Sequence, residues 1–425
     1  MTSVSAIIPI GYKQTEVGVI PEDWVLIKLG SFGAFSKGRG ITKSEANSGH
    51  IPSIRYGEIY TYHDDVVRSY NSHISSQVAE SSKMLRKGDI LFAGSGETRE
   101  EIGKCVVFID EIEAYAGGDV VIFSPRSENS TYLAYTLNSF QVSQQKSKLG
   151  QGDAVVHIYS SELSGVLIPI PPSEEEQKII ADIITDSDSQ IQALENLISK
   201  KRNLKKGTMQ KLLTGRARLP GFTEKWILKR VSNFGTIVTG STPLTHKPEF
   251  WGGNIPWITP TDITNRSEIF TSERQITIEG LDSIRILPEN SVLVTCIASI
   301  GKNIILRKLG SCNQQINAII PNQKYSTEFL YFLFENNKSF MIGNAGITAT
   351  MIISKTDFEK FTFLVPNSLE EQQAIAEILS DMDAEIFTLE QRLEKTKAIK
   401  QGMMQQLLTG RIRLVDPSTP VEASA

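Results

Sequence analysis

Two glycine-containing segments come nearest, in residue type and spacing, to a phosphate-binding loop. Gly94-Ser95-Gly96 is followed by Gly103-Lys104-Cys105. A phosphate-binding loop needs a fixed spacing before its Gly-Lys pair and a serine or threonine after it, since the hydroxyl binds magnesium. Here the spacing differs, and Cys105 takes the place of the hydroxyl. The residues are better interpreted as a glycine turn between strands, and Ser299-Ile300-Gly301-Lys302 is a similar stretch.

Other catalytic patterns are incomplete in this sequence. An adenine methyltransferase holds its flipped base with a short Asn/Asp-Pro-Pro-aromatic loop. The nearest match, Asp416-Pro417-Ser418, lacks the second proline and the aromatic residue. No carboxylate-plus-lysine nuclease pattern is convincing, and His63 and His157 have no partner pattern for acid–base catalysis. We therefore predict that the chain carries no catalytic residue, no metal and no cofactor of its own.

The composition predicts a cytoplasmic protein with two or three domains. The chain has 425 residues, 40% of them hydrophobic, with no apolar run of membrane-spanning length and no secretory signal at its start. Cys105, Cys296 and Cys312 lack C-x-x-C spacing, which argues against a disulfide framework or a zinc site. The net charge of −4 argues against binding nucleic acid through bulk positive charge but is compatible with local basic loops.

A segment that occurs twice in the sequence is the element expected to position the rest of the chain. Residues 172–219 have a second copy at 367–414, and each copy ends in Leu-Leu-Thr-Gly-Arg-x-Arg-Leu. Gln177 aligns with Gln372, and the same separation relates the two Leu-Leu-Thr-Gly motifs, so the copies align without a gap. This agreement indicates an internal duplication.

Each copy is predicted to form one long helix followed by a short one. Ser173 and Ser368 each precede a glutamate by three residues, the spacing of a capping box in which hydroxyl and carboxylate satisfy first-turn N–H groups. Gly207 and Gly402 are expected to interrupt the helix before its last turn. The glycine of each Thr-Gly pair suits the left-handed position that ends a helix.

An apolar seam recurs every three or four residues along both predicted helices, so the helices are expected to pair. An antiparallel pair within the chain is favoured because both copies lie in it, and a coiled coil between two chains is the alternative. The residues predicted for helix pairing and partner docking are Ile184, Ile191, Leu194, Ile198, Leu379, Met382, Ile386, Leu389 and Leu393.

A globular segment precedes each helical copy. Short apolar runs such as Val120–Phe123, bounded by turn residues, predict strands in both segments. Ile51–Ile54 corresponds to Ile255–Ile258, and Ile102-Gly103-Lys104 to Ile300-Gly301-Lys302, but at different offsets. The loops of the globular segments have therefore diverged in length, while the helices stayed in register.

This layout resembles the specificity subunit of type I restriction-modification systems. The resemblance covers almost the whole chain and rests on two divergent globular segments alternating with helical segments that carry E-E-Q near the start and L-L-T-G-R-x-R-L at the end. It implies an α+β fold, in which two mixed α/β target-recognition domains are separated by two long helices in an antiparallel coiled-coil pair. The tandem duplication would give the chain pseudo-two-fold symmetry.

The same resemblance implies that each domain reads one half of a split double-stranded DNA sequence. The implied partners are two methyltransferase subunits and the restriction/translocase subunits, which would bring S-adenosylmethionine, ATP and Mg. The predicted parts are an N-terminal segment (1–23), the first target-recognition domain (24–171), a central helical spacer (172–219), the second target-recognition domain (220–366), a C-terminal helical spacer (367–414) and a tail (415–425).

Side chains that read DNA are donors and acceptors on loops that can enter a groove, with cations nearby for the phosphates. The candidates in the first domain are Lys37, Arg39, Lys43, Arg55, Tyr56, Tyr60, Lys146, Lys148 and Gln151. Those in the second are Thr239, Ser241, Thr242, Lys247, Thr259, Thr261, Asn313 and Gln314. The basic run from Lys200 to Lys206 could face DNA that crosses between the domains, but the favoured interpretation is the solvated end of a helix.

A coiled-coil adaptor and a single-chain restriction-modification enzyme are the alternatives from other functional classes. A coiled-coil adaptor would not need two loop-rich domains with matching landmarks. A single-chain restriction-modification enzyme would need methyltransferase and nuclease motifs that a chain of this length cannot house beside two recognition domains. The leading prediction is therefore a non-catalytic DNA-recognition subunit, whose target bases do not follow from the sequence.

Overall fold

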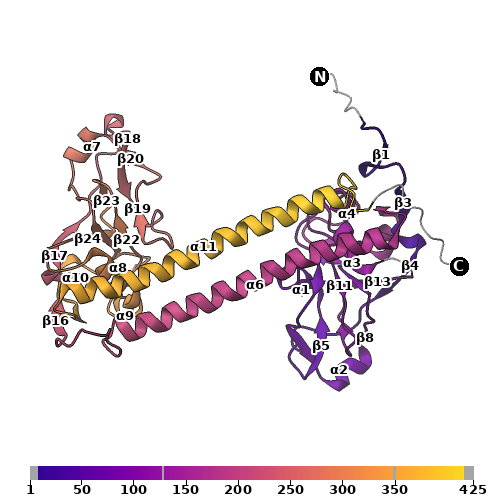
Figure 1. Ribbon diagram of the computed structural model, residues 1–425, viewed down its shortest axis with the longest axis horizontal. Helices are drawn as coiled ribbons and strands as arrows, with labels where there is room; N and C mark the ends of the chain where they lie inside the picture. Colours follow the sequence, from indigo (N-terminus) through magenta and orange to yellow (C-terminus); the bar gives the residue numbers. More distant parts are fainter. Residues whose placement is uncertain (1–7, 127–128, 348–350, 416–425) are drawn as a thin grey trace. The chain divides into compact units, whose positions relative to one another are not determined.

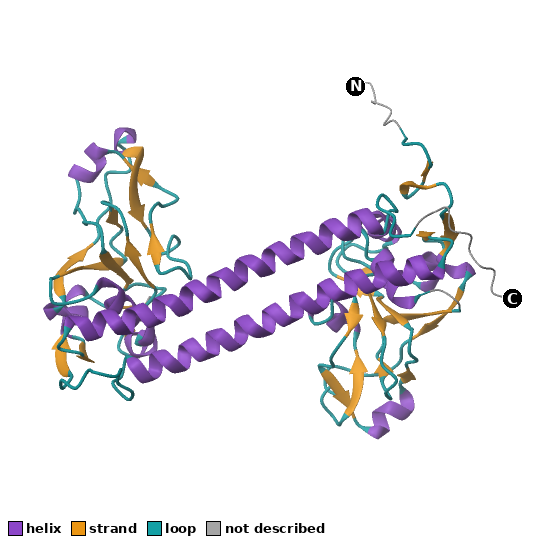
Figure 2. Ribbon diagram, in the orientation of Figure 1, coloured by secondary structure: helices purple, strands orange, loops and turns teal. Residues whose placement is uncertain are grey.

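The computed structural model describes residues 8–126, 129–347 and 351–415 (Figure 1). The chain forms two compact units: unit 1 contains the residues up to 193 together with those from 393 onward, and unit 2 contains residues 194–392. Each unit combines strands with helices (Figure 2). The α+β prediction is confirmed.

A five-stranded sheet with strand order β4-β13-β9-β11-β6 forms the centre of unit 1. Its strands are β4 (Gly33–Lys37), β13 (Val120–Pro125), β9 (Ile90–Ala93), β11 (Cys105–Phe108) and β6 (Val66–Val67). Neighbours are antiparallel except β11 and β6, which are parallel. All residues of β9 and β11 are buried, since one face packs in the cluster with helix α3 (Ser130–Leu137) and the other with β5 and α1.

The other strands of unit 1 form a four-stranded sheet of order β7-β5-β12-β8 and the pairs β1-β2, β3-β15 and β10-β14. These strands are β1 (Tyr12–Thr15), β2 (Gly18–Pro21), β3 (Val25–Lys28), β5 (Ile51–Ile54), β7 (Ser72–Ile74), β8 (Lys83–Met84), β10 (Ser95–Gly96), β12 (Tyr115–Ala116), β14 (Val156–His157) and β15 (Leu167–Ile170). The short helices are η1 (Leu29–Ser31), α1 (Tyr56–Thr61), α2 (Ser76–Ser81), α4 (Phe140–Leu149) and α5 (Ser160–Ser164).

Unit 2 has a five-stranded sheet of order β17-β24-β21-β22-β19, a three-stranded sheet of order β20-β18-β23, and the pairs β16-β27 and β25-β26. The strands are β16 (Ile227–Arg230), β17 (Gly235–Thr239), β18 (Trp251–Ile258), β19 (Glu268–Ile269), β20 (Gln275–Ile276), β21 (Ser291–Thr295), β22 (Asn303–Leu306), β23 (Ser311–Cys312), β24 (Ile316–Pro321), β25 (Gly346–Ile347), β26 (Met351–Ile352) and β27 (Thr362–Val365). The short helices are η2 (Val231–Asn233), η3 (Pro248–Phe250), α7 (Ile278–Asp282), α8 (Thr327–Asn336), α9 (Lys338–Gly343) and α10 (Lys355–Lys360).

The two units repeat one topology. The strand order of the five-stranded sheet is the same in both, and in each the last pair, β11-β6 or β22-β19, is parallel. The landmark stretches predicted to correspond lie in equivalent strands, β5 and β18. Gly103 and Gly301 both have positive φ two residues before β11 and β22 begin, which confirms the glycine-turn interpretation.

Two helices of 39 residues complete the fold, α6 (Glu174–Leu212) and α11 (Leu369–Leu407). The predicted interruptions at Gly207 and Gly402 were wrong, because both glycines lie inside uninterrupted helix. A glycine inside a helix costs only about 1 kcal/mol relative to alanine, which packing against a core offsets. The predicted helix ends are correct: Gly215 and Gly410 have φ of 69° and 67°.

The helices pack antiparallel within each unit. In unit 1, Ile180 and Ile184 at the start of α6 share a core cluster with Leu407 and Leu408 at the end of the second repeat. In unit 2, the equivalent residues from the end of the first repeat pack with the start of α11. The predicted seam positions Ile184, Leu194, Ile198, Leu379 and Ile386 are buried, and Ile191, Met382, Leu389 and Leu393 are half-buried. Ile184 and Leu379 belong to the cores of the globular parts.

The residues that the two repeats share form one contact twice. Arg413 of the second repeat binds Glu176 of the first, with Nε–Oε1 at 2.6 Å and Nη2–Oε2 at 2.9 Å. Arg218 of the first repeat binds Glu371 of the second in the same way, at 2.6 and 2.8 Å. We call these two contacts the arginine–glutamate clamps. Each repeat therefore ends by engaging the start of the other, which explains why both ends of the repeated segment are alike.

The clamps also correct the capping-box prediction. The Ser173 and Ser368 hydroxyls do accept hydrogen bonds from the N–H groups three residues on, at 3.4 and 3.2 Å. The carboxylates of Glu176 and Glu371, however, bind arginine with both oxygens. The serine–glutamate spacing of a local capping box thus also supplies the glutamate of a long-range ion pair.

The basic run from Lys200 to Lys206 lies in the interior of α6, so its interpretation as a helix end was wrong. Within unit 2 three of its cations bind acidic residues of α11, in the pairs Lys201–Glu385, Arg202–Glu390 and Lys205–Asp383. Lys400, the equivalent of Lys205, binds Asp188 at 2.6 Å and Asp65 at 2.7 Å in unit 1. These ion pairs add polar specificity to the apolar seam.

Of the described residues, no helix is long and apolar enough to cross a membrane. Cys105, Cys296 and Cys312 are buried and free. The rejected methyltransferase match, Asp416-Pro417-Ser418, lies outside the described residues, as does most of the predicted tail.

Candidate nucleic-acid interface

Three loops of unit 2 that carry sequence-predicted residues are joined by hydrogen bonds. The segment after β17 meets the turn before β24, since Ser241 N–H donates to Cys312 O at 2.8 Å and Thr242 Oγ1 donates to Gln314 Oε1 at 2.6 Å. Asn313 N–H donates to Ile258 O at 2.9 Å, which brings in the loop after β18.

The loop after β18 is shaped by Asp262. Its Oδ2 accepts from the Thr259 N–H at 2.8 Å and from Thr259 Oγ1 at 2.6 Å, and its Oδ1 accepts from the Glu273 N–H at 2.8 Å. The Thr259 and Thr261 hydroxyls lie 2.8 Å apart. Two of the predicted hydroxyls are therefore presented together at a fixed place.

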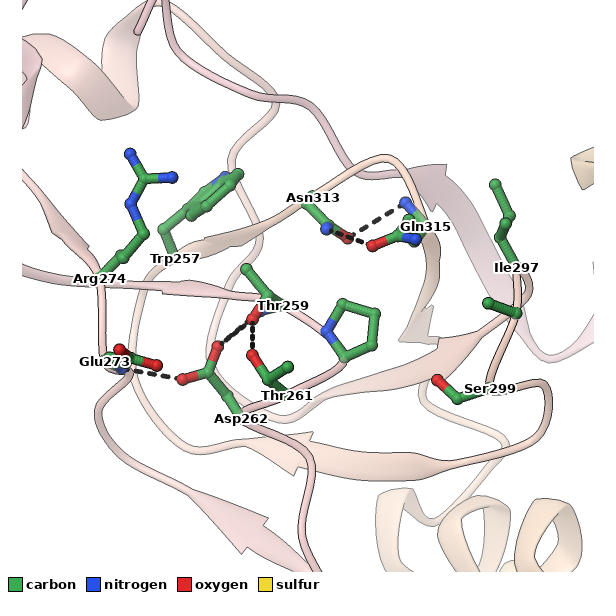
Figure 3. A pocket seen from close by; sticks show the side chains of 12 residues that line it. Trp257, Thr259, Thr261, Asp262, Glu273, Arg274, Ile297, Ser299, Asn313 and Gln315 are labelled. Carbon is green, nitrogen blue, oxygen red and sulfur yellow. Dashed lines mark hydrogen bonds between the residues drawn. The ribbon is translucent and has the colours of Figure 1, made fainter.

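These loops surround a pocket of about 500 Å³ (Figure 3). Three of the predicted residues, Thr259, Thr261 and Asn313, line it. Asn313 Nδ2 donates to Gln315 Oε1 at 3.0 Å, so two amide side chains share one wall. The pocket thus presents hydroxyl and amide groups, which can both donate and accept, as base edges require.

Unit 1 builds the equivalent loops on the same frame. Arg39 N–H donates to Ala116 O at 3.1 Å, Gly117 N–H to Ile54 O at 2.9 Å, and Arg55 N–H to Glu58 Oε2 at 3.1 Å. Lys37 and Arg39 are exposed, and Arg55 is half-exposed. Unit 1 therefore presents cations where unit 2 presents hydroxyls.

A glycine is required at one position of this frame in both units. A Cβ atom added at Gly38 would lie 1.9 Å from Gly117 O, and one added at Gly240 would lie 2.1 Å from Asn313 O. Such contacts are impossible without moving the backbone, so the two loops can approach only with glycine at this position.

The prediction that Lys146 contacts DNA was wrong. Lys146 is 1% exposed, its ammonium donates to Gly103 O at 2.5 Å, and burial lowers the pKa of this ammonium. A buried cation cannot reach a phosphate, so Lys146 ties α4 to the turn before β11. Lys148 is exposed on the same helix, and Gln151 is exposed with its amide 3.3 Å from Glu162 Oε1.

The remaining candidates differ in environment. Lys43 is exposed on the loop after β4, and Lys247 lies 4.9 Å from the centre of the Phe250 ring. Tyr56 and Tyr60 pack against the core of unit 1, and burial raises the pKa of Tyr60. The side chains of both tyrosines are therefore held by packing and are less free to move than side chains on a solvated loop.

Three residues at or near the unit 2 pocket do not follow from the sequence patterns. Arg285 Nη1 donates to Thr239 O at 2.7 Å and so holds the loop after β17. Arg274 and Glu273 line the pocket from the segment before β20. No spacing pattern links Glu273 and Arg274 to the other loops, because the pairing of β18 with β20 brings them there.

The chain thus consists of two alike sheet frames that present polar loops of different chemistry, each tied to a pair of shared helices. That architecture defines a class of tandem recognition proteins. A family described as the type I restriction modification DNA specificity domain matches residues 21–201 and again residues 223–401. The chain therefore belongs to this family of DNA specificity subunits of type I restriction-modification complexes.

Individual relatives agree with this assignment. The chain is 35% identical to the MjaIX specificity subunit of Methanocaldococcus jannaschii over 164 residues, which cover 37% of this chain and 38% of that protein. It is 26% identical to the EcoR124I/EcoR124II specificity subunit of Escherichia coli over 291 residues, 64% of this chain and 69% of that protein. The S subunit structure from M. genitalium has a TM-score of 0.60 over 90% of this chain and 96% of that one, at 14% identity, which shows a shared fold.

Family membership confirms the predicted role as the non-catalytic, DNA-recognising part of the complex. In this family the cofactors belong to the methyltransferase and restriction subunits. The coiled-coil adaptor and the single-chain enzyme are thereby set aside.

Proposed function

We propose that the two units read the two halves of a split DNA sequence, unit 1 one half and unit 2 the other. The observation that carries this proposal is that equivalent loops on one topology hold different side chains. Lys37 and Arg39 of unit 1 stand where unit 2 has Thr239 and Ser241. A shared frame with different donors and acceptors suits two half-sites of different sequence.

We further propose that the helices dock two methyltransferase subunits, with restriction/translocase subunits joining for cleavage, in the cytoplasm. Leu204 of α6 and Ile399 of α11 occupy equivalent positions of the repeat and are 56% and 50% exposed. Exposed apolar side chains at matched positions support two like partners, because a duplicated surface offers the same contact twice.

Methylation assays test the proposed function directly. We expect the purified chain to transfer no methyl group from S-adenosylmethionine to genomic DNA, because it lacks the loop that holds a flipped adenine. Adding the methyltransferase subunits of the same system is expected to give methylation at one bipartite sequence, read by long-read sequencing. Methylation by the chain alone, or by the complex without sequence preference, would contradict the proposal.

Exchanging one recognition domain is expected to change one half of the target. A chimaera with residues 24–171 from a relative should methylate sites that differ only in the half read by unit 1, since the loops of unit 2 are untouched. The reciprocal exchange of residues 220–366 serves as the matched control and should change the other half. A change in both halves from either exchange would show that the units read jointly.

A further inference from the structure

Arg274 lies at the rim of the unit 2 pocket with its guanidinium over two tryptophan rings (Figure 3 shows it beside Trp257). Its Cζ atom is 3.9 Å from the centre of the Trp251 ring and 5.3 Å from that of Trp257. The two rings are 5.1 Å apart and nearly perpendicular, at 89°. A guanidinium over an indole face is attracted by the ring's negative face, so the side chain has a preferred place.

Hydrogen bonds hold Trp251, Trp257 and the backbone of Arg274 in place. The indole N–H of Trp251 donates to Leu244 O at 3.3 Å, and that of Trp257 donates to Ser241 O at 2.9 Å. Ser272 Oγ accepts from the Trp257 N–H at 2.9 Å and donates to Arg274 O at 2.6 Å. The backbone of Arg274 and both rings under its side chain are therefore held together.

The donors of this guanidinium are left unused by the protein. Across residues 8–126, 129–347 and 351–415, no hydrogen bond or ion pair involves the Arg274 side chain. The nearby Asp262 carboxylate is occupied by Thr259 and by the Glu273 N–H. A planar fork of donors, held in place without a protein acceptor, is arranged for an acceptor that comes from outside.

We propose that Arg274 reads a guanine in the half-site bound by unit 2, by donating to its O6 and N7 atoms in the major groove. The inference rests on the proposed function and specifies one base of that target. Arginine's fork matches the two guanine acceptors in the major groove. The same fork can bind phosphate oxygens, but a phosphate contact would carry no sequence preference, so the two interpretations differ in the test below. The amide groups of Asn313 and Gln315 at the same pocket are further side chains of base-reading type.

The test uses the complete complex with its methyltransferase subunits and a duplex library randomised across the half-sites. The wild type is expected to require a G·C pair at a defined position of the unit 2 half-site. In R274A, discrimination at that position is expected to fall about 10- to 100-fold, while the unit 1 half-site keeps its sequence. R274K retains the charge but lacks the fork, so the same position should also be relaxed.

R230A is the matched control, because Arg230 is an exposed arginine of the same unit that lies on β16 and not at the pocket. It should leave both half-sites unchanged. Three results would overturn the inference. The first is a wild-type unit 2 half-site without a G·C pair, and the second is an unchanged sequence preference in R274A. The third is a loss of methylation in R274A that is equal at all sequences and that R274K restores. The last result would identify a phosphate contact. A wild-type complex without any bipartite preference would instead contradict the proposed function, before a variant is made.

Discussion

Replacing Arg413 with alanine is expected to destabilise unit 1 by about 3–5 kcal/mol, the usual cost of leaving one partner of a buried ion pair alone. Glu176 is 1% exposed and would lose the partner that binds both of its carboxylate oxygens. Arg413 also binds Asp23, at 2.9 and 3.0 Å, and lies over the Trp24 ring. Among the residues that the structure describes, Arg218 binds no second acid, and Glu371 also accepts from the Trp226 indole N–H at 3.2 Å, so R218A is expected to destabilise unit 2 by less.

Hydrogen exchange followed by mass spectrometry measures this effect unit by unit, which a single melting curve of a two-unit chain does not. Arg411 provides the matched control, since it is an exposed arginine two residues away in the same motif. R411A should change stability by no more than about 0.5 kcal/mol. The double variant E176Q/R413M should recover part of the loss, because it leaves no unpaired charge. Unchanged protection of unit 1 in R413A would show that the clamp does not stabilise it.

Inserting four helix-forming residues after Ser199 is expected to lengthen the unspecified gap between the half-sites by about one or two base pairs. The insertion adds about 6 Å of helix, at about 1.5 Å per residue, and B-DNA rises about 3.4 Å per base pair. Because α6 is uninterrupted from Glu174 to Leu212, the added turn should stay helical. Four residues exceed one turn by roughly 40°, so affinity is expected to fall.

Methylation of duplexes with graded spacers measures this change. The same four residues inserted after Gly221, beyond the end of α6, form the control and should leave the preferred gap unchanged. An active Ser199 insertion variant with the original gap would contradict a role of the helices in setting the spacing.

The sequence predicted the helices well because their signals are local and occur twice. The apolar period, the serine caps and the terminal glycines each act within a few residues, and duplication made them easy to recognise. The role of Glu176 could not be predicted in this way, since its partner Arg413 lies 237 residues further along. A glutamate three residues after a serine satisfies a capping pattern whether or not it serves another contact.

The candidate interface was predicted from residue type, which identifies groups that can bind DNA but not where they lie. Thr259, Thr261 and Asn313 do meet at one pocket. The prediction for Lys146 failed because the charge of a side chain does not show whether it is buried. Its spacing of four residues from Val142, which is buried on the same helix, was a signal that Lys146 lies on the buried face. Arg274 was missed since its partners Trp251 and Trp257 lie on β18, and only the pairing of β18 with β20 brings Arg274 beside them.

The clamps also bear on the order in which the chain folds during synthesis. Unit 2 is continuous in sequence and can close once residue 392 has left the ribosome, whereas unit 1 needs the residues from 393 onward. At about 5–20 residues per second, making the 237 residues between Glu176 and Arg413 takes roughly 10–50 s. The segment of unit 1 that precedes unit 2 in the sequence is therefore made earlier but completes its core later. Until then, Leu407 and Leu408 do not cover the apolar side chains around Trp24.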